Sequence, residues 1–302
     1  MHQRAEGLIM RLPLNIRHRL IRVAVLCALL LPFLCATVLP QSRINSASDR
    51  SPSRPLIIAH RGGALEFTEN TIPAFERALR LGSDGIETDL RLTRDGVVVI
   101  YHDDRFGRVE GLAPAQRTRR ISEMTYRELR SQPLARVGED DGRSFVPTLG
   151  ELLGSVKTGL LNIELKRGED FDDLVDGTVK ILKRFADLDR VVLEPPDLET
   201  AKKLRSEFGP RLKLHINPGY DRSVDYFSSL ERVLKFKPHS ISVNYKKVSL
   251  ELVETAHNAG VEVWVWTVDS REIARAMQLL GVDAIKTDRP ASLIDLIRKS
   301  QR

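Results

Sequence analysis

The 302-residue sequence predicts a (β/α)8 barrel, or TIM barrel, preceded by an N-terminal hydrophobic leader. From Leu56 onward, eight short runs rich in β-branched apolar residues alternate with longer segments of helical periodicity. This alternation is typical of parallel strands joined by crossover helices, and eight such units favour a closed barrel over an open sheet. Residues 56–302 are therefore expected to form one folded domain, close to the ~250 residues that such barrels use.

The strands and helices follow one another in this pattern. The predicted strands are Leu56–Ala59, Gly85–Leu90, Gly159–Leu165, Arg190–Glu194, Leu212–Ile216, Ser240–Asn244, Val261–Thr267 and Ala284–Thr287. The clearest amphipathic helices between them are Pro73–Leu81, Phe171–Phe185, Leu198–Phe208, Leu250–Ala259 and Arg271–Leu280. Ahead of the first of these, Asn70 or Thr71 is expected to cap the helix.

One apolar run, Val97–His102, breaks the alternation because the link from the second strand is too short for a crossover helix. The link contains Asp95-Gly96, which is a hairpin turn signal. We therefore expect this run to fold back on the second strand as an antiparallel arm that is not a barrel strand. The expected register places Glu87 opposite His102.

After this arm the periodicity weakens over residues 103–146, apart from a helical patch at Ile121–Leu129. The segment starts at the carboxyl end of the barrel, where insertions commonly form lids and specificity loops. We interpret it as a cap insertion. The alternative is a long connector without a role in function.

The positive charge of the chain lies outside the predicted barrel. Residues 1–55 hold eight arginines and two acidic residues, so they carry the whole formal net charge of +6. The other 247 residues hold 39 basic and 39 acidic residues. A neutral body argues against nucleic acid as a partner.

The N-terminal segment has the composition of a targeting sequence. Arginines precede an uncharged apolar run from Val23 to Leu39, which predicts a signal peptide for export to the periplasm or the exterior, or a membrane anchor, within residues 1–40. Residues 41–55 are rich in Ser, Arg and Pro and are expected to be a linker. Both cysteines lie in the leader, so the body uses no disulfide.

Carboxylates cluster where predicted strands end. Glu87 and Asp89 lie two apart on one strand and therefore point to the same face, and Glu164 and Lys166 repeat this spacing on the next barrel strand. Three carboxylates at a barrel mouth suit a hard divalent cation, Ca²⁺ or Mg²⁺. A structural alternative is salt bridging to Arg91 or Lys166.

Two histidines flank this cluster in the sequence. His60 and His102 each end an apolar run, and together they could take a proton from a nucleophile and give one to a leaving group. Arg61 and Lys166 could hold phosphate oxygens. Trp266, at another strand end, could line the substrate pocket or could be a core aromatic. Each histidine alone could equally be a strand-end residue bonded to a carbonyl.

The body resembles the glycerophosphodiester phosphodiesterase family through an ordered set of motifs. The set is His60-Arg-Gly, Glu69-Asn-Thr, Gly85-Ile-Glu-Thr-Asp89, Asp95-Gly96, His102-Asp103, Val146-Pro-Thr-Leu, Asn162-Ile-Glu-Leu-Lys166, Trp266-Thr-Val and Thr287-Asp-Arg-Pro. The resemblance implies a (β/α)8 barrel that hydrolyses glycerophosphodiesters to glycerol 3-phosphate and an alcohol. It implies that His60 and His102 are the acid/base pair.

The same resemblance implies that Glu87, Asp89 and Glu164 bind the metal and that Arg61 and Lys166 contact phosphate. The chain departs from the family pattern at Glu194-Pro-Pro, where Ser-Phe is common, at Asp269, where asparagine is common, and at Gly107-Arg-Val. These departures leave the preferred alcohol open. A lysophospholipase D is the main alternative, and a non-catalytic binding barrel is disfavoured because no site residue is missing. The sequence predicts no oligomeric state.

Overall fold

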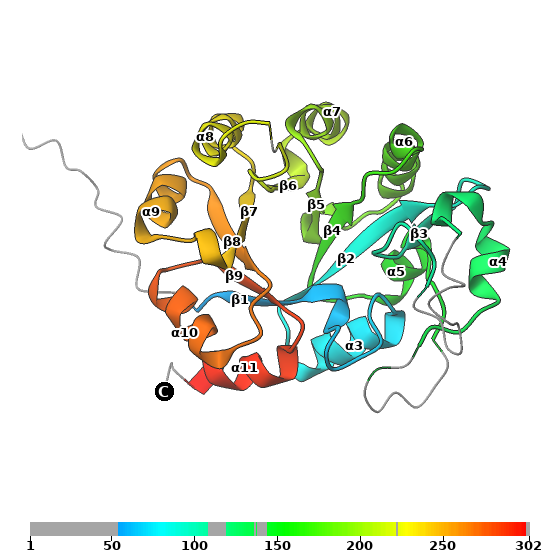
Figure 1. Cartoon of the computed structure of the whole chain (residues 1–302), viewed down its shortest axis with the longest axis horizontal. Helices are drawn as coiled ribbons and strands as arrows, with labels where there is room; N and C mark the ends of the chain where they lie inside the picture. Colours follow the sequence, from blue (N-terminus) through cyan, green and yellow to red (C-terminus); the bar gives the residue numbers. More distant parts are fainter. Residues whose placement is uncertain (1–53, 108–118, 136, 138–143, 222, 300–302) are drawn as a thin grey trace, which may run out of the picture. The chain divides into compact units, whose positions relative to one another are not determined.

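In a computed structural model, residues 54–299 are described except for 108–118, 136, 138–143 and 222. Eight parallel strands pair in the order β1-β2-β4-β5-β6-β7-β8-β9, and β9 pairs back to β1 to close a barrel. Helices follow one another around these strands in chain order (Figure 1). The predicted (β/α)8 fold is confirmed.

The barrel strands agree with the predicted ones to within two residues at each end. They are β1 (Leu56–Ala59), β2 (Gly85–Leu92), β4 (Leu160–Leu165), β5 (Val191–Glu194), β6 (Lys213–Ile216), β7 (Ser240–Asn244), β8 (Glu262–Trp266) and β9 (Ala284–Thr287). Each is short and buried, as parallel strands covered by helices are.

The α-helices are α3 (Ile72–Leu81), α4 (Tyr126–Arg130), α5 (Leu149–Ser155), α6 (Phe171–Leu182), α7 (Leu198–Phe208), α8 (Tyr226–Phe236), α9 (Leu250–Asn258), α10 (Arg271–Leu279) and α11 (Pro290–Lys299). Short 3₁₀ turns are η3 (His60–Gly62), η5 (Ile121–Glu123), η6 (Leu188–Arg190), η7 (Gly209–Arg211) and η8 (Tyr245–Lys247). Of the two expected caps for α3, Thr71 is the one that accepts a bond from the Ala74 amide.

The antiparallel arm is present as β3 (Val98–Ile100), which pairs with β2. Its expected register is wrong by one residue, because Leu90 pairs with Ile100 and Arg91 with Val99. The reason is the turn: Gly96 has φ +75°, so Arg94, Asp95 and Gly96 form a three-residue loop. Glu87 is therefore not opposite His102, and in this register Asp89 faces Tyr101, whose amide donates to the Asp89 carbonyl at 3.0 Å.

The inside of the barrel changes from apolar to polar along the strands. Inward-facing Ile58, Val192, Trp264 and Ala284 form a small apolar cluster. Two residues farther along each of these strands, the same face carries His60, Glu194, Trp266 and Lys286, which line a cavity. The carboxyl end of the barrel is therefore the polar end, as the fold class predicts for a functional site.

The described part of the predicted cap has an apolar cluster of its own. Tyr101, Phe106, Ile121, Met124 and Leu129 belong to this cluster, and η5 and α4 match the predicted helical patch. The segment is therefore folded against β3 where it is described, and its role as a cap stays a prediction.

The predicted leader, residues 1–40, lies outside the described residues, as does all of the predicted linker except Arg54 and Pro55. Among the helices that the structure describes, none has the length and apolarity needed to cross a bilayer.

Candidate active site

Three carboxylates meet at the polar end of the barrel. The register of β2 and β4 places Asp89 beside Glu164, and Glu87 shares the inward face of β2. One oxygen from each of Glu87, Asp89 and Glu164 lies within 4.8 Å of the others. Glu87 and Asp89 are buried and Glu164 is half-buried. The structure therefore brings together the three residues that the sequence singled out.

Lys166 is the cation nearest to this cluster. Its ammonium lies 3.0 Å from Asp89 Oδ1 and 2.8 Å from Glu164 Oε1. The guanidinium of Arg61 also lies 3.6 Å from Asp89, but it contacts Glu69 as well. Two cations against four carboxylates leave a net negative charge at this end of the barrel, which is costly unless a further cation is bound. An all-oxygen set of this kind fits Ca²⁺ or Mg²⁺.

The two buried carboxylates differ in pKa. Burial, reinforced by the neighbouring Asp89, raises the pKa of Glu87 to about 7. Burial acts in the same direction on Asp89, but the charges of Lys166 and His102 outweigh it and hold the pKa of Asp89 well below its usual range. Asp89 is therefore an anion at neutral pH, whereas Glu87 is poised to exchange a proton.

The turn after β1 supports this cluster. Arg61 has φ +52° and Asn70 has φ +58°, a left-handed conformation that is uncommon outside glycine and concentrates at functional sites. In this conformation the Arg61 amide donates to Glu87 Oε2 at 3.0 Å, and the Asn70 amide group donates to Asp89 Oδ2 at 2.9 Å. Gly62 completes the turn, since a Cβ there would lie 3.0 Å from Ala74 Cβ.

Arg61 also presents its side chain to the cavity. The guanidinium lies 3.4 Å from Glu69 and 3.6 Å from Asp89. It is therefore held between two carboxylates at the cavity wall. Lys166 lines the same cavity, so both predicted phosphate-binding residues reach it.

His60 is held by a carboxylate from the far end of the chain. Its Nδ1 lies 2.6 Å from Asp288 Oδ1, and its Nε2 lies 3.8 Å from Glu87 Oε2. Burial alone would lower the pKa of His60, but the carboxylates of Glu87 and Asp288 outweigh burial and raise it. The Asp288 bond orients the ring so that Nε2 faces the carboxylate cluster.

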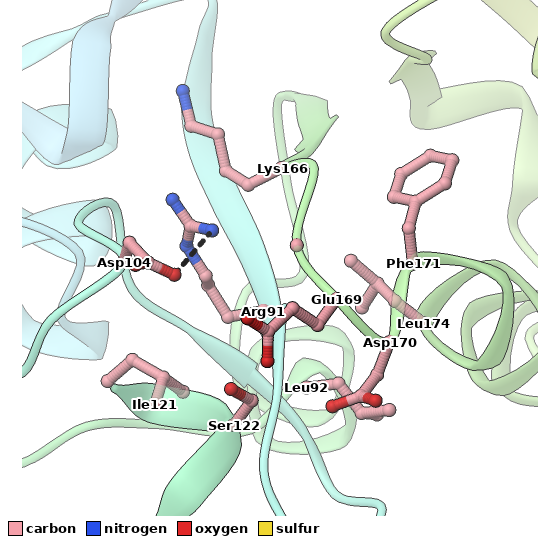
Figure 2. A pocket seen from close by; sticks show the side chains of 11 residues that line it. Arg91, Leu92, Asp104, Ile121, Ser122, Lys166, Glu169, Asp170, Phe171 and Leu174 are labelled. Carbon is pink, nitrogen blue, oxygen red and sulfur yellow. Dashed lines mark ion pairs between the residues drawn. The ribbon is translucent and has the colours of Figure 1, made fainter. Parts of the chain in front are cut away.

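His102 has a similar support. Its Nδ1 lies 2.7 Å from Asp103 Oδ1, and its carbonyl accepts bonds from Arg91 Nε at 3.1 Å and Nη2 at 2.7 Å. Figure 2 shows Arg91 turned toward Asp104, with which it forms an ion pair at 3.9 Å. Arg91 therefore anchors the backbone of His102. Of the two salt-bridge partners that the sequence left open as a structural alternative, Lys166 contacts the carboxylate cluster, and the ion pair of Arg91 is with Asp104.

These groups surround a cavity of about 310 Å³. Its wall is lined by His60, Arg61, Glu87, His102, Glu164, Lys166, Glu194, Asn217, Tyr220, Ser242, Trp266, Thr267 and Lys286. All of the predicted site residues line it except Asp89, which lies beneath as a fully buried carboxylate.

Comparison with known proteins identifies the family to which the chain belongs. A profile of the Glycerophosphoryl diester phosphodiesterase family matches residues 60–292. A "Glycerophosphodiester phosphodiesterase" from Caldanaerobacter subterraneus is 32% identical over 253 residues, which are 82% of this chain and 99% of that protein. The chain belongs to the glycerophosphodiester phosphodiesterase family.

Two further proteins that resemble this chain are a bacterial one of known structure and a human enzyme. A crystal structure of a putative glycerophosphoryl diester phosphodiesterase from Silicibacter pomeroyi superposes with a TM-score of 0.73 at 26% identity, covering 82% of this chain and 95% of that one. A human "Lysophospholipase D" is 25% identical over 80% of this chain and 85% of its own length. The phosphodiesterase class of this enzyme is thus shown, and the lysophospholipase relatives are more distant.

Several supporting residues of this phosphodiesterase were not assigned a role from the sequence. Asn70, expected only as a helix cap, binds Asp89, and Asp288 binds His60. Tyr220 donates its hydroxyl to Glu164 Oε1 at 2.9 Å, and its burial raises its pKa so that it stays a donor. Two of them carried a signal: Asp288 directly follows the last strand and therefore lies at the polar end of the barrel, and Asn70 belongs to the Glu69-Asn-Thr motif.

At two of the positions where the chain departs from the family pattern, the side chain makes defined contacts near the cavity. Asp269 accepts bonds from the Thr287 hydroxyl at 3.1 Å and from the Asp288 amide at 2.8 Å, so it fixes the turn that carries Asp288. Glu194 lines the cavity and pairs with Lys286 at 2.6 Å. Of the third departure, only Gly107 lies within the described residues.

Proposed function

We propose that this phosphodiesterase hydrolyses glycerophosphodiesters to glycerol 3-phosphate and an alcohol, using a divalent cation and two histidines. One observation carries the proposal: two histidines, each bonded through Nδ1 to an aspartate, line a cavity beside a cluster of three carboxylates, two of which line the cavity and one of which lies beneath it. Proton transfer and charge neutralisation are the two needs of phosphodiester cleavage, and this geometry supplies both.

Glu87, Asp89 and Glu164 would hold the cation, either Ca²⁺ or Mg²⁺. When bound, the cation neutralises charge on the phosphate oxygens and makes phosphorus more electrophilic. Tyr220 and Asn70 orient Glu164 and Asp89 through their hydrogen bonds. Arg61 and Lys166 bind the non-bridging phosphate oxygens from the cavity wall.

The histidines move the protons. Because Nδ1 of each ring is bonded to an aspartate, Nε2 is the atom that exchanges a proton with the substrate. One histidine accepts the proton of the attacking hydroxyl, and the other gives a proton to the departing alkoxide. The nucleophile is either water or the glycerol hydroxyl next to the diester, and trapping a cyclic glycerol phosphate would identify the second route.

The test is a coupled assay for glycerol 3-phosphate release from glycerophosphocholine by the full-length protein. We expect His102→Ala to lower kcat by at least about 100-fold, the scale of general acid–base catalysis. The matched control is His257→Ala, which also removes a histidine bonded to an aspartate, Asp283 at 2.8 Å, outside the cavity. No glycerol 3-phosphate from any glycerophosphodiester would contradict the proposal.

We also propose that the enzyme acts outside the cytoplasm, either exported or anchored to the membrane by residues 1–40. The arginine-flanked apolar run and the cysteine-free body support this location. Fractionation of cells that express the full-length protein tests it. Recovery of the protein in the cytosol with its leader intact would contradict it.

A further inference from the structure

The two walls of the cavity carry different side chains. The groups of the proposed reaction, from His60 to Lys166, come from β2, β4 and the segments that follow β1, β3 and β4. The opposite wall is built by β5, β7, β8 and β9, which contribute Glu194, Ser242, Trp266 and Lys286. None of these four residues has a part in the reaction described above. A substrate bound between the two walls would contact both.

The centre of the opposite wall is a buried ion pair. Lys286 Nζ lies 2.6 Å from Glu194 Oε2, and each side chain is only 4% exposed. The neighbouring His215 lies 3.6 Å from Glu194, but burial and the charge of Lys286 lower the pKa of His215, so this imidazole is neutral. Lys286 is therefore the cation that balances Glu194.

This pair retains hydrogen-bonding capacity. An ammonium has three N–H donors, and among the described residues that of Lys286 donates only to Glu194. Beside it, Ser242 Oγ and Trp266 Nε1 are buried atoms without a hydrogen-bond partner in the part of the chain that the structure describes. Buried polar groups normally have partners, and both residues line the cavity, so a ligand in the cavity is a suitable partner for these two donors.

The side chains of this opposite wall favour a ligand with hydroxyl groups over a second phosphate group. Glu194 neutralises Lys286, so the pair has little net attraction for an anion. Side by side, however, the carboxylate accepts a hydrogen bond while the ammonium donates one. A hydroxyl does both, whereas an esterified hydroxyl has no proton to give.

We propose that the Glu194–Lys286 pair, together with Ser242 and Trp266, binds the free hydroxyls of the polyol arm of the diester and so selects deacylated over acylated substrates. This inference rests on the proposed function. Both residues of the pair line the cavity and are almost fully buried, so the pair lies where an arm of the substrate would reach it. A stability role explains it poorly, because apolar residues often replace a buried ion pair without loss of stability.

The decisive variant is the double substitution Glu194→Met with Lys286→Met, which removes both charges and leaves no unpaired ion in the barrel. Three substrates are compared at a saturating cation concentration: glycerophosphocholine, lysophosphatidylcholine and bis(p-nitrophenyl) phosphate, which has no hydroxyl. We expect kcat/KM for glycerophosphocholine to fall at least about 10-fold, the scale of hydrogen bonds to charged groups. Bis(p-nitrophenyl) phosphate can be cleaved only if water is the nucleophile. If the wild type cleaves it, the rate of the double variant should stay within about threefold, since this ester makes no such hydrogen bond. If the wild type does not cleave it, lysophosphatidylcholine, which has one free hydroxyl fewer, is the reference substrate.

In the double variant, the ratio of kcat/KM for glycerophosphocholine to kcat/KM for lysophosphatidylcholine should fall as well. Two further variants accompany the double variant. Ser242→Ala removes one hydroxyl without changing charge, and should weaken only glycerophosphocholine turnover even if the double variant does not fold. The control replaces the exposed pair Asp176–Lys203, 2.8 Å apart, with Asn and Met and should change nothing.

The outcomes separate this inference from the proposed function. A wild-type enzyme that releases no glycerol 3-phosphate refutes the function itself. If the wild type is active but the double variant slows every substrate that the wild type cleaves by the same factor, the pair acts through the carboxylate cluster and the specificity role is wrong. Unchanged kinetics in the double variant, or in Ser242→Ala if the double variant does not fold, would also overturn it.

Discussion

His60 Nδ1 lies 2.6 Å from Asp288 Oδ1, although the two residues are 228 positions apart in the chain. Closure of the barrel explains the contact, because β1 and β9 pair in register and His60 and Asp288 directly follow Ala59 and Thr287, which are partners. The first and last strands thus jointly build one half of the acid/base pair. An open sheet could not make this contact.

The first prediction concerns this pair. Asp288→Asn should lower kcat by about 100-fold, because the amide can donate to Nδ1 and so favour the tautomer that leaves Nε2 protonated. Loss of the carboxylate should also lower the pKa of His60 and shift the corresponding limb of the pH–rate profile to lower pH. Steady-state kinetics between pH 5 and pH 9 measure both effects.

The control for Asp288→Asn is Asp176→Asn, which changes an exposed carboxylate on α6. Its kinetics should equal those of the wild type. If Asp288→Asn lowered only the melting temperature and left the pH–rate profile in place, Asp288 would be a structural residue and the positioning role would be wrong.

A second prediction concerns Arg91. Its guanidinium donates two bonds to the His102 carbonyl, which a lysine cannot do with the same planar geometry. Arg91→Lys should therefore lower kcat by about 10-fold with less change in KM, since His102 loses its anchor while the cavity keeps its charges. Arg94→Lys, at an exposed position beyond the cavity, is the matched control; equal kinetics of the two variants would refute the role of Arg91.

A third prediction concerns pH and metal binding. The pKa of Glu87 is raised to about 7 in the metal-free protein, and a carboxylate must be ionised to bind a cation. Metal binding near pH 7 should therefore release protons, and affinity should decrease as the pH falls from 8 to 6. Calorimetry in two buffers of different ionisation enthalpy measures the proton count. In Glu87→Gln both the proton release and most of the affinity should be lost.

The raised pKa of Glu87 also determines how the folding stability of the metal-free protein changes with pH. A buried Glu87 that binds its proton more tightly when folded contributes more stability below pH 4.5 than above pH 7. Asp89 acts in the opposite direction, because its pKa is lowered and its stabilisation is lost as the pH falls through the acid range. Thermal unfolding of Glu87→Gln should therefore depend less on pH between 5 and 8 than that of the wild type.

The fold and the carboxylate cluster could be predicted from sequence because their signals are periodic. Alternation of strands and helices fixed the eight units, and spacing by two placed Glu87 and Asp89 on one face. The hairpin register was predicted wrongly, since the turn signal of Asp95-Gly96 does not determine the loop length. A change of one residue in the length of the loop shifts the register, so that different side chains of β2 and β3 lie opposite each other.

Contacts between side chains that lie far apart in the sequence could not be predicted, because no local sequence pattern indicates them. Tyr220 lies 56 residues from Glu164, and Lys286 lies 92 residues from Glu194, so neither contact follows from sequence spacing. Asn70 was expected only to cap α3, but its left-handed backbone turns the side chain toward Asp89. Such contacts depend on barrel closure and on backbone conformations that no periodicity reveals.

The most direct test of the account is the cation dependence of the full-length enzyme. Glycerol 3-phosphate release from glycerophosphocholine is measured after treatment with chelator and after re-addition of Ca²⁺ or Mg²⁺, in the wild type and in Glu164→Gln. We predict that chelator lowers the rate at least about 100-fold, that a divalent cation restores it, and that Glu164→Gln requires more cation for half of its activity. Unchanged release in chelator would contradict the central claim that Glu87, Asp89 and Glu164 form a metal-dependent phosphodiesterase site.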